Sequence, residues 1–205
     1  MAAGEVKAEA GGVTVRIAGR TLRFDDREVQ RRAKQGRRGA LARACGAQPG
    51  VSVHDALAGW GTDGLLLAML GCRVHMTEAH PDVCAALAAR VRATALPPSC
   101  AVPTWACGDA RECWHERRFD VVYLDPMFGD HPRGALPALR MQALAALADE
   151  MGDDELAQML VAARKSAASR VVVKRRRRAP AVAPPDWRIL GRSVRFDVYR
   201  GGALP

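Results

Sequence analysis

A predicted strand over residues 119–124, apolar except for Asp120, leads directly into Asp125, Pro126, Met127 and Phe128. An exocyclic amine of a nucleic-acid base is a weak nucleophile because its lone pair is delocalised into the ring. Asp125 and the carbonyl of Pro126 can each accept one hydrogen of such an amine, and Phe128 can stack on the base. The segment therefore predicts a site that aligns a base amine for group transfer. The alternative is a strand followed by an ordinary Asp-Pro turn, with Phe128 in the core.

A glycine-rich turn at residues 59–61 follows a predicted strand and precedes a predicted helix. Its Gly-x-Gly-x-x-Gly spacing is typical of dinucleotide sites, so a nicotinamide oxidoreductase is one interpretation. Asp55 and Asp63 bracket the turn, however, and two carboxylates would repel a pyrophosphate, which needs N–H donors and no nearby anions. They suit a phosphate-free ligand that carries a sulfonium and an ammonium group, as S-adenosylmethionine does.

Acidic side chains also follow the next two predicted strands. Glu78 is placed to accept hydrogen bonds from ribose hydroxyls, and Asp109 from an adenine amine. Ligands of parallel sheets bind beyond the carboxyl ends of the strands, so we expect these acids to meet at one edge. Asp109 has a second interpretation as the N-cap of the helix that follows it.

The elements that must position these residues alternate between strand and helix, which predicts an α/β fold. Its sheet is expected to be mostly parallel and covered by helices on both faces. The predicted strands cover residues 51–56, 72–77, 102–107, 119–124 and 170–174, with a final hairpin of residues 187–190 and 194–199 around Gly191. The predicted helices cover residues 63–70, 82–92 (capped by Asp82) and roughly 135–168, broken near Gly152.

Residues 1–46 are expected to form a short basic extension, ahead of an α/β domain at residues 47–205. Alternating apolar residues predict a hairpin in this extension. In chain order we expect a flexible start at residues 1–12, the hairpin at 13–24, and a basic helix over 26–45 that is interrupted near Gly36 and Gly39.

The formal net charge of +9 favours an anionic partner. We expect the run Lys174–Arg178 to follow the fifth strand, at the same rim as the glycine turn, where it would contact RNA phosphates. A solvated charged loop is the alternative. The expected RNA contacts are Arg37, Arg38, Lys174, Arg175 and Arg176.

Several function classes are disfavoured by composition. No apolar run approaches the length of a membrane helix, and the first ten residues lack a secretory signal, so a cytoplasmic protein is expected. The six cysteines form no Cys-x-x-Cys pair and are expected to be reduced core thiols. Cys107, Cys113 and His115 lie close together, but their spacing fits no common zinc pattern, so no metal is expected.

Four segments, at residues 55–63, 71–78, 121–128 and 170–175, resemble the RsmJ family, and so does the closing segment at 191–199. The resemblance covers roughly residues 20–200. It implies a Rossmann-like class I methyltransferase fold with an antiparallel C-terminal hairpin, and S-adenosylmethionine as cofactor. The implied reaction is methylation of a guanine N2 in small-subunit ribosomal RNA.

The resemblance also implies roles for individual residues. Asp125 would be shared by the cofactor and the target base. With the chemistry of the segment at 125–128, the expected catalytic residues are Asp125, Pro126 and Phe128. The expected cofactor-binding residues are Asp55, Gly59, Gly61, Thr62, Asp63, Glu78, Ala79, Gly108, Asp109 and Asp125.

The glycine loop departs from the family pattern at Leu57 and Trp60, where the family usually has threonine and leucine. Three alternatives stay open. They are methylation of an adenine N6, a nicotinamide oxidoreductase, and an RNA-binding module without catalysis.

Overall fold

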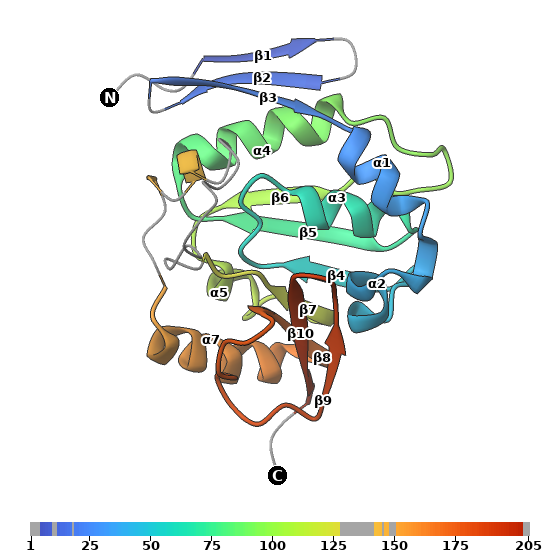
Figure 1. Cartoon of the computed structure of the whole chain (residues 1–205), viewed down its shortest axis with the longest axis vertical. Helices are drawn as coiled ribbons and strands as arrows, with labels where there is room; N and C mark the ends of the chain where they lie inside the picture. The colour runs from blue at the N-terminus through green and yellow to red at the C-terminus, as the bar shows by residue number, and fades with distance from the viewer. Residues whose placement is uncertain are drawn as a thin grey trace.

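A seven-stranded sheet forms the centre of the molecule (Figure 1). The computed structural model describes residues 5–9, 12–17, 19–127, 142–144, 146–147 and 151–202. The sheet consists of β4 (Ser52–Asp55), β5 (Arg73–Glu78), β6 (Thr104–Cys107), β7 (Phe119–Leu124), β8 (Ala167–Arg176), β9 (Trp187–Leu190) and β10 (Val194–Arg200).

The strand order is β6-β5-β4-β7-β8-β10-β9. The first five of these strands are parallel, whereas β10 is antiparallel to both β8 and β9. Because the order reverses between β4 and β7, the carboxyl ends of these two strands flank a topological switch point. The predicted α/β class, the mostly parallel sheet and the antiparallel C-terminal hairpin are confirmed.

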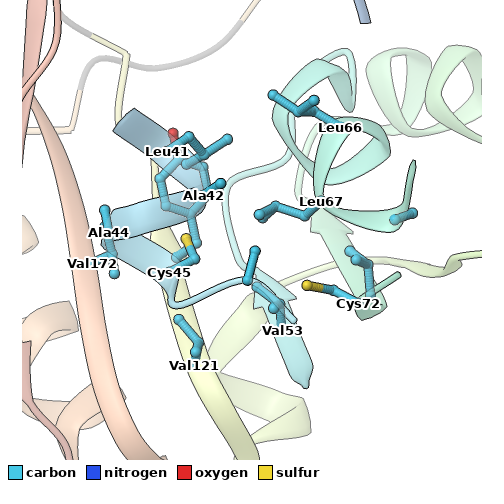
Figure 2. Packing of buried hydrophobic residues seen from close by; sticks show 14 of the residues in the cluster. Leu41, Ala42, Ala44, Cys45, Val53, Leu66, Leu67, Cys72, Val121 and Val172 are labelled. Atoms are coloured by element: carbon cyan, nitrogen blue, oxygen red, sulfur yellow. The ribbon is translucent and has the colours of Figure 1, made fainter. Parts of the chain in front are cut away.

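Both faces of the sheet are covered, as its apolar strands require. Along β7, Val121 and Tyr123 pack into one core cluster, while Val122 and Leu124 pack into another. Helices α2 (Ala40–Cys45), α3 (Thr62–Met69) and α4 (Pro81–Ala93) contribute to the first cluster, and α5 (Ala110–Cys113) and α7 (Asp153–Ser166) to the second. Figure 2 shows how α2 and α3 pack beside β4, β7 and β8 in the first cluster.

A second, three-stranded antiparallel sheet lies across α4 at the top of Figure 1. It contains β1 (Glu5–Glu9), β2 (Gly12–Ile17) and β3 (Arg20–Asp25). The predicted hairpin is confirmed as β2 and β3. The expectation of a flexible start at residues 1–12 is wrong for β1, because this short segment pairs with β2 over its whole length.

The basic helix predicted over residues 26–45 forms as three pieces: α1 (Arg27–Ala33), the 3-10 turn η1 (Gly36–Arg38) and α2. Val29 of α1 and Leu41 of α2 lie in the same buried cluster as Val53 of β4. The helices of the N-terminal segment therefore share a core with the seven-stranded sheet. A domain boundary near residue 46 stays a prediction.

Two local expectations are wrong. His80, not Asp82, is the N-cap of α4, and Pro81 occupies the first helical position, where its missing N–H costs nothing. Strand β8 runs to Arg176 instead of ending at Lys174, because its pairing with β10 continues as far as Arg176. Residues 174–176 of the basic run are therefore part of the sheet.

Of the helical region predicted over 135–168, α7 forms from Asp153, and residues 128–141 lie outside the described residues.

The expectation of reduced thiols is wrong for two cysteines. Cys84 of α4 and Cys107 at the end of β6 form a disulfide with a Cα–Cα distance of 5.7 Å. Their separation of 23 residues in the chain gave no local signal, but α4 packs beside β6. The free thiols are those of Cys45, Cys72, Cys100 and Cys113.

Among the described residues there is no helix with the length and apolar character that crossing a bilayer requires.

Candidate active site

A pocket of roughly 1350 Å³ opens at the carboxyl ends of four neighbouring strands. Asp55 ends β4, Glu78 ends β5, Asp109 follows β6 and Asp125 follows β7, and all four line this pocket. Asp63, at the start of α3, lines it as well. The structure thus brings together the acids that the sequence placed at the strand ends. Residues 21–24 of β3, together with Glu28 and Arg32 of α1, form part of the wall.

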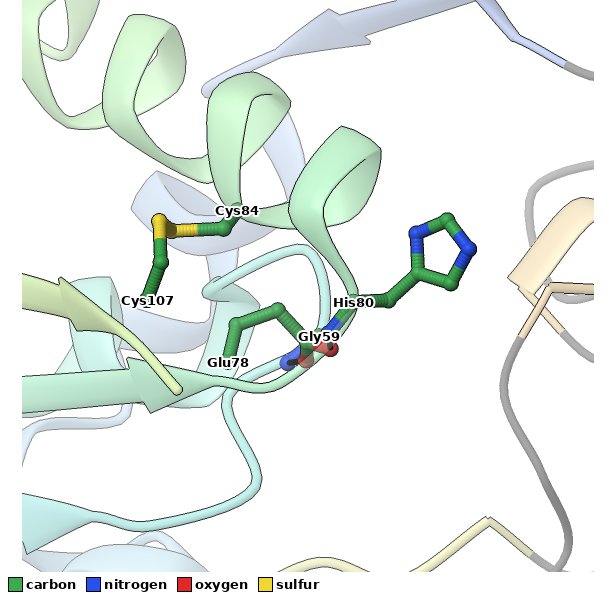
Figure 3. Close-up of a disulfide and its surroundings, with 5 residues drawn as sticks. All are labelled: Gly59, Glu78, His80, Cys84 and Cys107. Atoms are coloured by element: carbon green, nitrogen blue, oxygen red, sulfur yellow. Dashed lines mark hydrogen bonds between the residues drawn. A yellow bond between two sulfur atoms is a disulfide. The ribbon is translucent and has the colours of Figure 1, made fainter. Parts of the chain in front are cut away.

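The glycine turn is held tightly against the end of β5. Gly61 has a φ of 72°, a conformation that glycine adopts without strain, and a side chain there would collide with Leu87. The carboxylate of Glu78 accepts hydrogen bonds from the backbone N–H groups of Gly59 and His80, both at 2.8 Å (Figure 3). Each carboxylate oxygen keeps further acceptor capacity, so Glu78 fixes the turn and still faces the pocket.

Asp55 is the acid with an unused buried oxygen. Its side chain is 1 % exposed, and Oδ1 has no hydrogen-bond partner in the described part of the chain. Burial, together with the nearby carboxylates of Asp63 and Asp125, raises the pKa of Asp55 well above its usual value. An orphaned buried acceptor is costly unless a ligand satisfies it. Asp55 is therefore suited to a cationic or hydrogen-donating ligand in this pocket.

Asp63 is the centre of an ionic network. Its Oδ1 accepts from Arg32 at 2.6 Å, and its Oδ2 accepts from Tyr123 at 2.7 Å and from Lys174 at 3.0 Å. Burial opposes ionisation of Asp63, but the attraction of Lys174 and Arg32 outweighs it and holds the pKa below its usual range. Asp63 is thus a permanent anion beside the glycine turn.

Asp125 is connected to this network through Lys174, whose ammonium lies 2.7 Å from its Oδ2. Burial raises the pKa of Asp125, and the negative charge of Asp63 adds to the rise, while Lys174 opposes it. The side chain remains 29 % exposed, and Pro126 and Met127 line the pocket next to it. The predicted catalytic residue Phe128 lies outside the described residues.

Asp109 faces the pocket, but it has a structural role too. It is the N-cap of α5, where it accepts from the backbone N–H of Arg111 at 2.8 Å, and it pairs with the Arg111 guanidinium. Hydrogen bonds from Arg111 lower its pKa. Its alternative interpretation as a cap is confirmed. A contact to the adenine stays a prediction, as do those of the remaining expected cofactor residues Gly108, Thr62 and Ala79, which also line the pocket.

The expected RNA contacts are scattered over the surface and the interior. Arg37 and Arg38 are exposed in η1, and Arg176 is partly exposed and lines the pocket. Arg175 is 5 % exposed, and its guanidinium donates to Asp153 at 2.9 Å and to the carbonyl of Pro180.

Lys174 is committed to Asp63 and Asp125. Both it and Arg175 therefore have partners within the chain, whereas Arg177 and Arg178 beyond β8 are exposed.

A second cluster of possible metal ligands comes from β4, β5 and α5. The ligand atoms of His54, His75 and Cys113 lie within 4.8 Å of one another. Both ring nitrogens of His54 are already used, since Nδ1 accepts from Trp114 at 2.7 Å and Nε2 contacts the hydroxyl of Thr77 at 2.8 Å. Burial lowers the pKa of His54 to about 3, and His75 contributes. Its contacts are those of a neutral core histidine. The group of possible metal ligands noted in the sequence was Cys107, Cys113 and His115. It is not available as a set of three, because Cys107 is bonded in the disulfide.

Four residues of the site have roles that the sequence did not predict. Arg32 and Tyr123 were given no role from the sequence, although Tyr123 lies in the family-like segment 121–128. Their role follows from the way α1 and β7 converge on Asp63. Lys174 was predicted as an RNA contact, although the register of β8 beside β7 places it next to Asp125. Trp60, a departure in the glycine loop, packs against Phe24 of the N-terminal sheet at a ring distance of 5.1 Å. This departure anchors the sheet to the turn.

Comparisons with known proteins agree with this geometry. A family model described as "Putative SAM-dependent methyltransferase", where SAM is S-adenosylmethionine, matches residues 20–201. The Ribosomal RNA small subunit methyltransferase J of Alkalilimnicola ehrlichii is 43 % identical over 178 residues, which cover 80 % of this chain and 67 % of that protein. The protein of the same name from Legionella pneumophila is 35 % identical, with 91 % and 79 % covered. A crystal structure of a SAM-dependent methyltransferase from Neisseria gonorrhoeae has a TM-score of 0.71 and 30 % identity, with 98 % and 84 % covered.

The strand order and the acidic pocket at its switch point define the chain as a class I S-adenosylmethionine-dependent methyltransferase. The orphaned oxygen of Asp55 and the acids around the glycine turn fit this cofactor. The chain belongs to the ribosomal RNA small subunit methyltransferase J family. The resemblance noted in the sequence is thereby confirmed, and the oxidoreductase and non-catalytic alternatives are wrong.

Proposed function

We propose that this enzyme methylates the exocyclic N2 of a guanine in small-subunit ribosomal RNA. The observation that carries the proposal is the position of Asp125 and Pro126, which line the same pocket as Asp55, Asp63 and Glu78. An acceptor for a base amine and a site for a cationic cofactor thus share one cavity. The names of the family members indicate ribosomal RNA as the substrate. A cytoplasmic location follows if that RNA is the substrate.

In this proposal Asp55, Asp63 and Glu78 hold the cofactor. Asp55 supplies its unpartnered Oδ1 to the ammonium end, and Glu78 accepts from the ribose hydroxyls. S-adenosylmethionine supplies a methyl carbon whose bond to sulfur breaks as the amine nitrogen bonds to that carbon, and the bonding electron pair stays on the sulfur. Gly108 and Asp109 lie at the rim where the adenine would sit.

Asp125 and the carbonyl of Pro126 each accept one hydrogen of the guanine amine. This steers the nitrogen lone pair away from the ring and toward the methyl carbon, and alignment supplies much of the rate. The nitrogen becomes positively charged as it forms the new bond, so it must lose one proton. Asp125, whose pKa lies above its usual value, takes that proton and passes it to solvent. Phe128 remains our candidate for stacking on the base.

The test is methyl transfer from labelled S-adenosylmethionine to small-subunit ribosomal RNA, followed by mass spectrometry of the nucleosides. We expect N2-methylguanosine with the wild-type enzyme and at least roughly 100-fold less with Asp125→Asn, which keeps the shape of the side chain but loses its charge. N6-methyladenosine as the product would support the adenine alternative. No incorporation into this RNA, by an enzyme that binds the cofactor, would contradict the proposal.

A further inference from the structure

Lys174 occupies an unusual position for a lysine. It lies in β8 next to the carboxyl end of β7, and its side chain is only 22 % exposed. Its ammonium lies 2.7 Å from Asp125 Oδ2 and 3.0 Å from Asp63 Oδ2, so one cation bridges the acid proposed to hold the base and the acid beside the glycine turn. Charge-assisted hydrogen bonds of this length are strong and orient both partners.

The two carboxylates depend on Lys174 to different degrees. Asp63 also accepts from Arg32 and Tyr123, so it would keep two partners without the lysine. In the described part of the chain, Lys174 is the sole hydrogen-bond partner of the Asp125 carboxylate, and the contact uses Oδ2. Among the described residues, no hydrogen bond to Oδ1 of Asp125 is found. The lysine therefore determines the orientation of Asp125 far more than that of Asp63.

We propose that Lys174 is a positioning residue for methyl transfer, which clamps Oδ2 of Asp125 so that Oδ1 is presented to the hydrogen of the target amine. The inference rests on the proposed function, because it assumes that Asp125 holds that amine. It replaces the predicted role of Lys174 as an RNA contact. A lysine already bound by two carboxylates would have to give up both to reach a phosphate.

The charges around the pair explain why a cation is needed there. Asp125 faces Asp63 from α3, Asp55 from β4 and the Tyr123 hydroxyl from β7, while Arg32 from α1 is the other cation. Burial disfavours the charged form of Lys174, but Asp125 and Asp63 raise its pKa above the usual value, so the ammonium stays charged. Without that charge, burial and Asp63 would raise the pKa of Asp125 further.

The experiment compares wild type with Lys174→Met and Lys174→Arg. Lys174→Met removes the charge and keeps an unbranched side chain, whereas Lys174→Arg keeps the charge. Lys165→Met is the matched control, because Lys165 is exposed in the last turn of α7. Lys174→Gln serves as a second neutral variant if Lys174→Met does not fold, because it is polar but carries no charge to oppose protonation of Asp125.

The first readout is the pH profile of kcat on ribosomal RNA. The rate should fall at low pH, as Asp125 is protonated. In the neutral variants we expect kcat to be lower by roughly 100-fold, and the acid limb to move upward by about one pH unit or more. Lys174→Arg should keep the limb within about half a unit of wild type, because its charge still opposes protonation. A purely structural role would lower activity without moving the limb.

The second readout does not depend on activity. Titration of the carboxyl carbon of Asp125, followed by NMR in protein labelled with ¹³C at aspartate, should show a higher pKa in the neutral variants. Binding of S-adenosylhomocysteine, measured by calorimetry, should change by less than about fivefold, since Asp63 keeps Arg32 and Tyr123.

The outcomes separate the two proposals. An unchanged acid limb and an unchanged Asp125 titration in folded Lys174→Met or Lys174→Gln would overturn the role of Lys174 while leaving the proposed function intact. Absence of methylated guanosine with the wild-type enzyme would overturn the proposed function, whatever the NMR titration shows. A loss of S-adenosylhomocysteine binding as large as the loss of kcat would place Lys174 in cofactor binding and overturn its role toward Asp125.

Discussion

Single residues explain why the pocket prefers a cation. When all are ionised, the carboxylates of Asp55, Asp63 and Asp125 outnumber the cations Arg32 and Lys174 by one. S-adenosylmethionine carries a sulfonium and an ammonium group, and these carboxylates attract both cations. A pyrophosphate would add negative charge to a cluster that already repels it. The acids around the glycine turn therefore favour a phosphate-free, cationic cofactor over a dinucleotide.

A first prediction concerns Asp55, which has a buried oxygen without a partner. Asp55→Asn should raise the free energy of unfolding of the ligand-free protein by about 1–2 kcal/mol at pH 8, because the pKa of Asp55 is raised in the folded state and ionising it costs stability. The same variant should weaken S-adenosylhomocysteine binding by roughly tenfold or more, since a charge-assisted contact is lost. Chemical denaturation and calorimetry measure the two effects. Lower stability together with unchanged binding would contradict this account of Asp55.

At the same scale, the acids could be predicted and the cations could not. Asp55, Glu78 and Asp125 each lie at or directly after the end of a predicted strand, so the strand pattern alone places them at one edge. Arg32 and Lys174 lie among many other basic residues. What distinguishes these two is which carboxylate they reach, and that depends on packing between elements far apart in the chain.

At the scale of elements, the length of β8 decides which members of the basic run face the pocket. The run was expected to follow the strand, but pairing with β10 extends the strand through Arg176. Alternation along the strand then separates Lys174, which reaches the acids, from Arg175, which is buried against Asp153. A local pattern of charges cannot predict this, because the pairing partner lies about twenty residues further along the chain.

A second prediction concerns β4, where His54 is fully buried and its pKa is lowered to about 3. An unfolded histidine binds a proton near pH 6.5, so the stability due to the neutral ring is present above that pH and is lost as the pH falls toward 3. As the pH falls through this range, the free energy of unfolding should decrease in wild type more steeply than in His54→Gln. The difference between the two slopes should be up to about 1.4 kcal/mol per pH unit. Parallel curves from urea denaturation at pH 4 to 7 would show that His54 does not contribute.

A third prediction concerns the disulfide between α4 and β6, which lies beside Glu78 and His80 in Figure 3. Reduction should lower the free energy of unfolding by about 3 kcal/mol, because the unfolded chain regains a loop of 23 residues. Cys84→Ala/Cys107→Ala should unfold like the reduced wild type and should not respond to a reductant. Mass spectrometry should first show that the reductant changes the number of free thiols. Equal melting temperatures of wild type with and without reductant would then contradict the prediction.

At the scale of the whole molecule, the N-terminal sheet and α1 complete the wall of the pocket. Residues 21–24 and Arg32 line it together with the strand ends, and Trp60 ties the glycine turn to Phe24. The class of fold could be predicted from the alternation of strands and helices, and the order of strands from the resemblance. The position of the N-terminal extension over the site could not be predicted, because it depends on packing between the small sheet and α4.

A fourth prediction follows from the net charge of +9 and the exposed end of the basic run. Arg177→Ala/Arg178→Ala should flatten the dependence of RNA affinity on salt by about two units of slope, because two phosphate contacts are lost. Arg73→Ala/Arg118→Ala, at the opposite edge of the sheet, removes the same charge and should leave the slope unchanged. Filter-binding titrations over a series of salt concentrations measure both. Equal slopes for the two variants would remove the end of the run from the RNA footprint.

The proposed function places methylation of a guanine N2 of small-subunit ribosomal RNA in the acidic pocket at the strand ends. The most direct measurement is nucleoside mass spectrometry of that RNA from cells that lack the gene for this chain, complemented with wild type or with Asp125→Asn. We expect that one N2-methylguanosine is lost without the gene, returns with wild type and does not return with Asp125→Asn. An unchanged set of methylated guanosines in cells without the gene, or full restoration by Asp125→Asn, would contradict it.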